Sequence, residues 1–197
     1  MYPKARIDAL TDGIFAVAMT ILVLDVRLPD EFRPADAAAL ARALKQLWPK
    51  VFPYLLSFYV LGSSWLSMVR LRSRGGFVDR RYAVWWLLHL LLATCLPFST
   101  TVVGRFAQLA PSVWLYAANM AALSAIGYRL VALLPDIESG EQARDRKISL
   151  LVLIGTSVLC IGLTAINPAR ALWVYVLNVA AIPLARRIGR RRSARGV

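Results

Sequence analysis

Few side chains in this sequence have the chemistry needed for catalysis or metal binding. The one histidine, His89, and the two cysteines, Cys95 and Cys160, all lie inside long apolar stretches. No group of His, Cys, Asp and Glu has the spacing of a metal site, and no phosphate-binding loop or nucleophile elbow is present. The hydroxyls of Ser99-Thr100-Thr101 have no base nearby, and such hydroxyls in membrane helices usually bond between helices or to their own backbone. We therefore predict no metal, no cofactor and no enzymatic activity.

The composition places these side chains in a membrane. Of the 197 residues, 58% are hydrophobic and only 18% are charged, and the mean hydropathy is +0.57. These values exclude a disordered tail, a disulfide scaffold and almost any soluble enzyme. The net charge of +13 could indicate nucleic-acid binding, but the basic residues fall between long apolar runs. Their predicted partner is therefore the anionic inner face of a membrane and not nucleic acid.

The elements that must position the polar groups are membrane-spanning helices. A helix needs about 20 residues to cross the hydrocarbon core of a bilayer. The uncharged stretches cover residues 13–24, 51–69, 82–104, 106–128, 148–169 and 171–185. We predict an all-α integral membrane protein, one domain over residues 1–197, with helices at about 7–26, 50–70, 82–104, 111–134, 147–167 and 170–187. A short amphipathic helix should follow the first span after Asp36, because Leu40, Leu44, Leu47 and Trp48 share one face.

The distribution of basic residues predicts the orientation of these six helices. Sixteen Lys and Arg residues lie on the side of the two termini, and seven lie on the opposite side. The positive-inside rule therefore places both termini in the cytoplasm. The arginine-rich tail, residues 186–197, should lie in the cytoplasm against anionic lipid headgroups.

The first span is the shortest and lies between two carboxylates. Its 12 uncharged residues extend only about 18 Å, so Asp12 or Asp25 must lie near or within membrane depth. A carboxylate is costly there unless it faces protein or water, so this helix should lie inside an assembly. At 100° per residue, Asp12 lies opposite a face that carries small and aliphatic residues and one hydroxyl. That face consists of Gly13, Val17, Thr20, Ile21 and Leu24. By periodicity alone it fits ordinary packing or a narrow hydrophobic pathway.

The same segment resembles the first helix of the transmembrane protein 175 family, cation channels of lysosomes and bacteria. Their helix opens with Arg-x-x-x-Phe-Ser-Asp and continues through a small and aliphatic run that ends in Leu-Val-Leu-Asp. The motif positions are occupied here by Arg6, Leu10, Thr11 and Asp12. Leu10 and Thr11 depart from the motif, although Thr11 keeps a hydroxyl. Further similarities lie at Trp48-Pro49, 54–58, Trp65, Trp86 and 96–98, so the resemblance covers the first hundred residues.

This resemblance implies a potassium-permeable leak channel of modest selectivity, in a bacterial inner membrane and without a cofactor other than the permeant ion. Six helices per chain and a homotetramer are expected, with the first helix of each subunit lining the pore. The constriction carries over to Val17, Ile21 and Leu24, and a polar threonine layer to Thr20. We expect Arg6 and Asp12 to form an intrasubunit charged lock at the inner end. His89 and Trp86 are further candidates to support it.

Two other classes of protein stay open at this point. A small secondary transporter would usually carry coupling carboxylates in several spans, internal repeats or broken helices, and Pro97 alone is weak evidence of a break. A membrane scaffold would have no transport pathway at all.

Overall fold

A computed structural model describes residues 1–70, 76–133 and 140–176 as a bundle of long antiparallel helices. The long helices are α1 (Lys4–Ile21), α3 (Trp48–Arg70), α4 (Arg80–Phe106), α5 (Ala110–Ala132) and α6 (Gly140–Leu163). The 3-10 turn η1 (Leu22–Asp25) extends α1, and the short helix α2 (Ala37–Gln46) precedes α3. Helix α7 (Pro168–Ala171) and the 3-10 turn η2 (Leu172–Tyr175) follow α6.

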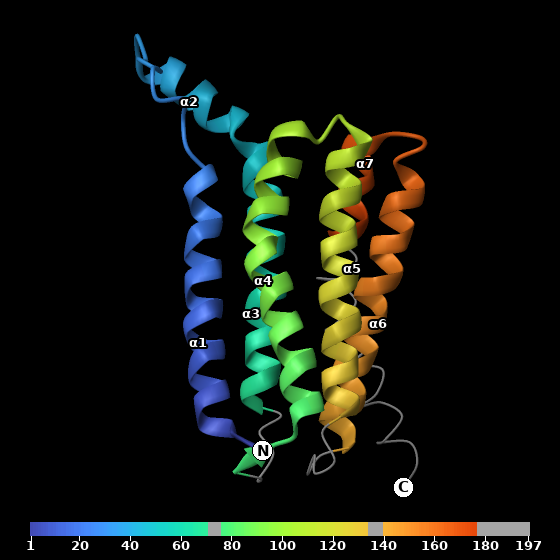
Figure 1. Ribbon diagram of the computed structural model, residues 1–197. Coiled ribbons are helices and arrows are strands. Elements are labelled where there is room, and N and C mark those ends of the chain that lie inside the picture. The colour runs from blue at the N-terminus through green and yellow to red at the C-terminus, as the bar shows by residue number, and fades with distance from the viewer. Residues whose placement is uncertain (71–75, 134–139, 177–197) are drawn as a thin grey trace, which may run out of the picture.

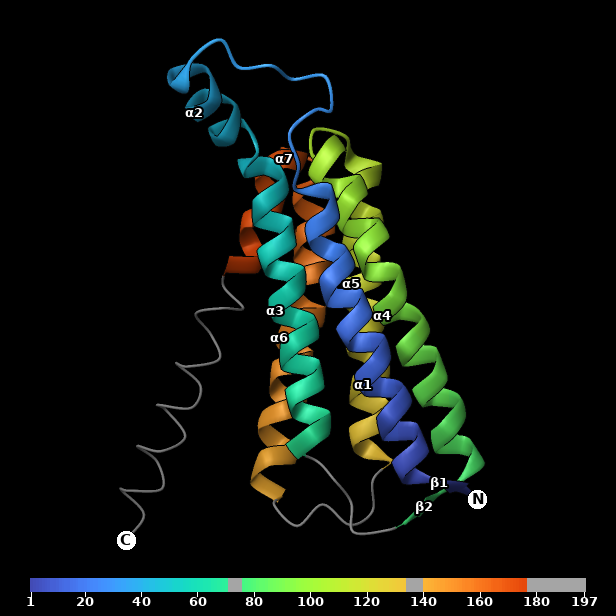
Figure 2. The same cartoon turned by 90° about the vertical axis from the view of Figure 1, so that its left-hand side faces the viewer.

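The helices pack in the order in which they follow one another, with α1 at one side of the bundle. Helix α1 packs on both α3 and α4, α4 packs on α5, and α5 packs on α6 (Figures 1 and 2). The core combines Phe15 of α1, Leu61 of α3, Leu96 of α4 and Met120 of α5, all fully buried. Because α1 contacts the rest of the subunit along one side only, its opposite side stays open.

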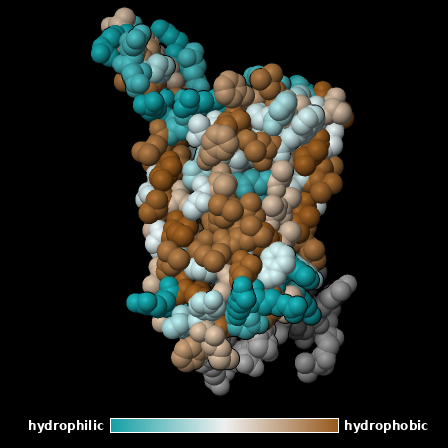
Figure 3. All heavy atoms as spheres, viewed as in Figure 1, coloured by the Kyte–Doolittle hydropathy of each residue, from teal (hydrophilic) through white to brown (hydrophobic). Residues whose placement is uncertain are grey.

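The predicted membrane spans are only partly tested by these elements. Within the part of the chain that the structure describes, four helices are long and apolar enough to cross a membrane, beginning at Lys4, Trp48, Arg80 and Ala143. Helix α5 has 23 residues and matches the fourth predicted span in position. Most of the sixth, 170–187, and the whole basic tail, 186–197, lie outside the described residues. The protein is therefore a multi-pass membrane protein, and in Figure 3 a broad hydrophobic surface lies between hydrophilic ends.

A two-residue strand pair that the sequence did not predict ties the N-terminus to the start of α4. Strand β1 (Tyr2–Pro3) pairs antiparallel with β2 (Phe77–Val78), and Lys4 N donates to Gly76 O at 2.9 Å. The pairing satisfies backbone groups that would otherwise be free at the beginning of α1, where no side chain caps the helix. It also places the first residues of α1 beside those of α4.

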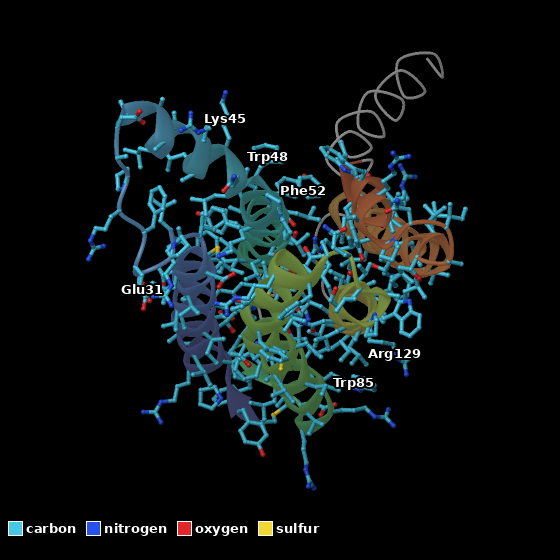
Figure 4. All side chains as sticks on the ribbon, turned by 90° about the horizontal axis from the view of Figure 1, so that it is seen from above. Glu31, Lys45, Trp48, Phe52, Trp85 and Arg129 are labelled. Atoms are coloured by element: carbon cyan, nitrogen blue, oxygen red, sulfur yellow. The ribbon has the colours of Figure 1, made fainter. Side chains whose placement is uncertain are left out.

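Helix α2 begins where the sequence predicted a helix start. Asp36 is its N-cap, and its Oδ1 accepts a bond from Ala39 N at 2.6 Å. Leu40 and Leu44 are exposed, and α2 projects away from the bundle at the end opposite the N-terminus (Figure 1). Seen from that end, Lys45 and Trp48 lie at the edge of the molecule (Figure 4).

A tag fused to the C-terminus should be inaccessible from outside intact cells. The described helices alternate in direction, so that Lys4 and Arg80 begin helices at one end and Arg105 ends α4 at the other. Sixteen basic residues on the side of the termini against seven on the other side predict that the end where α1 and α4 begin is cytoplasmic. Protease protection or antibody labelling of intact cells measures this. Labelling without permeabilisation would show that the orientation is wrong.

Candidate pore-lining helix and its anchors

The outward face of α1 is apolar and uncovered in the single subunit. Val17, Ile21 and Leu24 are 56%, 45% and 66% exposed, and Gly13 beside them is also exposed. Within this exposed face, the positions that the sequence placed on one strip do lie together, because they fall within about 60° of Val17 around the helix. In a membrane protein an apolar strip with this exposure faces lipid, another subunit or a shared axis between subunits.

The inward face of α1 is held by packing against α3 and α4. Thr11, Phe15, Ala18 and Leu22 are buried and recur every three or four residues, which is the spacing of one helical face. Ala18 is small enough for the neighbouring helices to approach closely, while Phe15 stacks on His89 with ring centroids 6.2 Å apart. This packing sets the rotation of α1 and therefore fixes which residues point outward.

Thr20 is the one hydroxyl on the outward strip. Its Oγ1 lies 3.0 Å from Ala16 O and 2.9 Å from Val17 O, so its proton is directed to its own helix. The lone pairs of the oxygen consequently remain for an outside partner. A hydroxyl in this state can act as a ligand for a cation.

Two tryptophans anchor the inner half of α1 through the motif residues. Trp86 Nε1 of α4 donates to Thr11 Oγ1 at 2.9 Å, and Thr11 in turn donates to Ile7 O at 2.8 Å. Trp65 Nε1 of α3 donates to Asp12 Oδ1 at 2.7 Å. Trp86 thus supports the inner end of α1. The hydroxyl retained at Thr11 accepts the bond from Trp86.

The Arg6–Asp12 lock expected from the sequence is not formed within the described part of the subunit, and that prediction is corrected. Residues six apart on one helix lie about 9 Å apart along the axis and on different faces. The ion pair at this end joins Lys4 to Asp8, four residues apart, at 2.8 Å. Arg6 is exposed, and Asp12, though exposed, is directed to its own subunit by Trp65.

A second charged anchor lies at the outer end of α1. Asp25 ends η1 and accepts bonds from Arg105 of α4, with Nε at 2.9 Å and Nη2 closer still. Arg105 is the one charged residue between positions 82 and 128, so it was the available partner at the outer end of that helix. The sequence analysis missed it because the two residues are 80 positions apart. The carboxylate is thereby neutralised at the membrane boundary, as its cost there requires.

His89 lies beside the inner anchors without bonding to them. It is fully buried, and neither ring nitrogen has a hydrogen-bond partner among the described residues, although the Leu123 carbonyl lies nearby. Together with Asp12 and Trp86, its ring lines a cavity at the inner end of the bundle. The volume available to the centres of water molecules in this cavity is about 50 Å³. One water needs roughly 10–15 Å³ by this measure, so water can satisfy the ring. The described residues contain no group of three His, Cys, Asp or Glu side chains suited to a metal ion.

The hydroxyls of the Ser99-Thr100 segment join helices and are not arranged for nucleophilic chemistry. Thr100 Oγ1 bonds Leu96 O at 2.7 Å and Ser57 Oγ of α3 at 2.7 Å. Ser57 Oγ also bonds Tyr116 Oη of α5 at 2.9 Å. The Asn119 amide bonds Ser99 Oγ at 3.1 Å in either orientation of the amide. This buried network holds α3, α4 and α5 together behind α1.

The sequence is similar to those of known potassium channels. The sequence model of a family described as the endosomal/lysosomal potassium channel TMEM175 matches residues 6–97. The chain is 32% identical over 130 residues to a potassium channel of Chamaesiphon minutus, covering 64% of this chain and 63% of that protein. It is 32% identical over 106 residues to a potassium channel of Streptomyces collinus, covering 54% and 50%. The matched region therefore spans between half and two thirds of these relatives.

A solved structure extends the similarity to the whole fold. It is the crystal structure of a lysosomal potassium-selective channel TMEM175 homolog from Chamaesiphon minutus. The TM-score is 0.76 at 25% sequence identity, over 92% of this chain and 96% of that one. The helix arrangement described above is thus one that a potassium-selective channel homolog uses.

Proposed function

Since the chain belongs to the transmembrane protein 175 family, we propose that it forms a potassium-permeable cation channel in which α1 of each subunit lines the pore. The observation that carries this proposal is the exposed apolar strip of α1, Val17, Ile21 and Leu24, opposite a face fixed by packing and anchors. No other segment of the described chain packs over that strip. We propose potassium as the permeant ion because relatives of this chain are named potassium channels.

The proposed assembly is a homotetramer in a bacterial inner membrane with both termini in the cytoplasm. Four symmetric copies of α1 around one axis turn each outward residue into a ring. In this arrangement the apolar strip that a single subunit leaves open faces the shared axis. Asp12 in the inner half of α1 and Asp25 at the end of η1 are already bonded to Trp65 and Arg105, so they need no partner from the pore.

The proposed mechanism of permeation follows from the chemistry of these rings. Rings of Val17, Ile21 and Leu24 side chains resist hydration, so a narrow apolar segment imposes a desolvation barrier on every ion. A ring of Thr20 oxygens replaces part of the lost water. Potassium is less tightly hydrated than sodium and therefore pays less in this segment. With one oxygen per subunit in the ring, the preference for potassium should be modest.

Flux through purified protein in potassium-loaded liposomes tests this function against its alternatives. A channel gives fast flux that follows the membrane potential and does not saturate readily. A secondary transporter gives slow flux coupled to a second solute. A scaffold gives no flux above that of empty liposomes, and this result would refute the proposal.

Cysteine substitution along α1 should reveal the pore face. We expect a water-soluble thiol reagent to block flux when cysteine replaces Val17, Thr20, Ile21 or Leu24. Cysteine at Ala18, which is buried against the subunit, is the matched control and should be protected from the reagent. The background is Cys95→Ala/Cys160→Ala, since Cys95 is an exposed thiol. Equal reactivity around the helix would contradict the assignment.

Thr20→Val should weaken potassium preference without disturbing the fold. The substitution removes one hydroxyl per subunit and keeps the shape of the side chain, and Thr20 is exposed, so packing in the subunit is unaffected. We expect the ratio of potassium to sodium permeability, taken from reversal potentials in bilayers, to fall about two- to fivefold, which is less than 1 kcal/mol in a barrier. Thr20→Ser, which retains the oxygen, is the control. An unchanged ratio in Thr20→Val would exclude the threonine layer.

A further inference from the structure

An arginine near the inner end of α6 is a charged group that the proposed pore does not use. Arg146 is partly buried, and its Nη2 donates to Ser64 Oγ of α3 at 2.8 Å. Ser64 itself is almost completely buried. A guanidinium has five N–H donors, and none of the carboxylates whose side chains are described forms an ion pair with Arg146. A charge withdrawn from water needs a counter-charge nearby.

A small cavity lies against this arginine between α3, α5 and α6. Its polar lining among the described residues consists of Tyr59, Ser63, Ser64, Ser124, Arg146 and Ser149, and none of these is a carboxylate. Three of the serines donate to carbonyls of their own helices, at 2.8 to 3.0 Å. Within the described chain, the hydroxyls of Tyr59 and Ser64 donate no such bond. The cavity therefore presents free donors from one cation and two hydroxyls.

Two carboxylates near Arg146 are already bonded to other groups. Asp8 and Asp12 line the neighbouring cavity, which Arg146 and His89 also line. Asp8 accepts both of its bonds from Lys4 at 2.8 Å, and Asp12 accepts from Trp65. His89, within electrostatic range of Arg146, is buried with both nitrogens unbonded in the described structure. The surroundings of Arg146 are thus richer in unused donors than in acceptors.

The size of the cavity decides which anion fits. The volume available to the centres of water molecules in this cavity is about 30 Å³. One water needs roughly 10–15 Å³ of such volume. Two waters, or one halide-sized ion with a water, can therefore enter. A halide-sized ion matches this space more closely than a phosphate group with five heavy atoms does.

We propose that Arg146 holds a small monovalent inorganic anion of the size of chloride in this cavity, with the Ser64 and Tyr59 hydroxyls as further donors. The anion lies inside each subunit, behind the helices that pack against α1. It therefore stabilises the contact between α3 and α6 and is not on the permeation pathway. This site is independent of which cation, if any, crosses the membrane.

Thermal unfolding of the full-length protein in detergent tests the site. We expect a saturable rise of the unfolding midpoint when potassium chloride replaces potassium gluconate at equal ionic strength, since gluconate is too large for the cavity. Arg146→Gln should abolish this rise, and Ser64→Ala should weaken the apparent chloride affinity about tenfold, as expected for one charge-assisted hydrogen bond. The matched control is Arg129→Gln, because Arg129 is exposed and lies over the ring of Trp85 (Figure 4). It should keep the chloride response.

Bromide provides a direct readout that does not depend on stability. Crystals grown with bromide should give an anomalous peak between Arg146 and Tyr59 in each subunit, and crystals of Ser64→Ala at limiting bromide should give a weaker one. If Arg146→Gln fails to fold, Tyr59→Phe keeps the charge and should still lower the bromide occupancy. No chloride response and no bromide peak in the wild-type protein would overturn the proposal. A chloride response retained in Arg146→Gln would do the same.

Discussion

Replacing Ile21 or Leu24 by asparagine should raise the conductance of the channel and reduce its discrimination between cations. Both side chains lie on the open face of α1, and in the proposed tetramer each substitution places four amides around the axis. Exposing a leucine side chain costs about 1.5–3 kcal/mol relative to burying it, so an apolar ring is a substantial barrier to hydration. Lowering the barrier by about 1.4 kcal/mol corresponds to about a tenfold increase in rate.

Single-channel recording in planar bilayers measures both effects of the asparagine substitutions. Leu24→Met is the matched control, because it changes shape at nearly constant volume and keeps the ring apolar. Its conductance should stay within about twofold of the wild-type value, a barrier change below 0.5 kcal/mol. Ala18→Ser, on the face packed against α3 and α4, should have as little effect. A conductance unchanged by Leu24→Asn would mean that the constriction lies elsewhere.

Asp12→Ala should lower the yield of assembled protein. The substitution leaves the indole N–H of Trp65 without its acceptor and removes a bond between the inner half of α1 and α3. A hydrogen bond to a charged group contributes about 1.5–3 kcal/mol, and the exposure of Asp12 reduces this to about 1 kcal/mol per subunit. Because all four subunits of the proposed tetramer would share the loss, the assembled form should be markedly depleted. Size-exclusion chromatography of the solubilised protein measures this.

The conservative variants separate a structural role of Asp12 from a role in permeation. Asp12→Asn retains an oxygen acceptor for Trp65 and should assemble better than Asp12→Ala. Trp65→Phe removes the donor and should show the same defect as Asp12→Ala, with little further loss in the double variant. A fully assembled Asp12→Ala channel whose conductance alone has changed would identify Asp12 as a ligand of the permeating ion. The orientation of α1 would then be wrong.

Much of the fold could be predicted from local features of the sequence, namely uncharged stretches, helical periodicity and a helix N-cap. Uncharged stretches near 20 residues long predict helices because backbone groups in lipid must bond within their own segment. The described helices α3, α4 and α5 agree with three of these stretches to within four residues at each end. Helix α6 begins eight residues before its stretch and ends six residues before the end of it. The outward strip of Val17, Thr20, Ile21 and Leu24 follows from helical periodicity alone and agrees with the exposed face of α1. The start of α2 was equally local, because Asp36 bonds a backbone amide three residues ahead.

Only the tertiary structure decided which polar groups meet. Asp12 bonds Trp65 across 53 positions and Asp25 bonds Arg105 across 80, and no periodicity within one helix encodes such a pairing. Arg6 resembled a partner for Asp12 because the motif places them close in sequence, yet helix geometry separates them and Asp8 takes the nearby Lys4. In the sequence, Arg146 is one of the sixteen basic residues on the predicted cytoplasmic side. The tertiary structure shows that hydroxyls of α3 and α5 surround it. Spacing along the chain determines which residues share a face of a helix, whereas packing between helices determines what that face contacts.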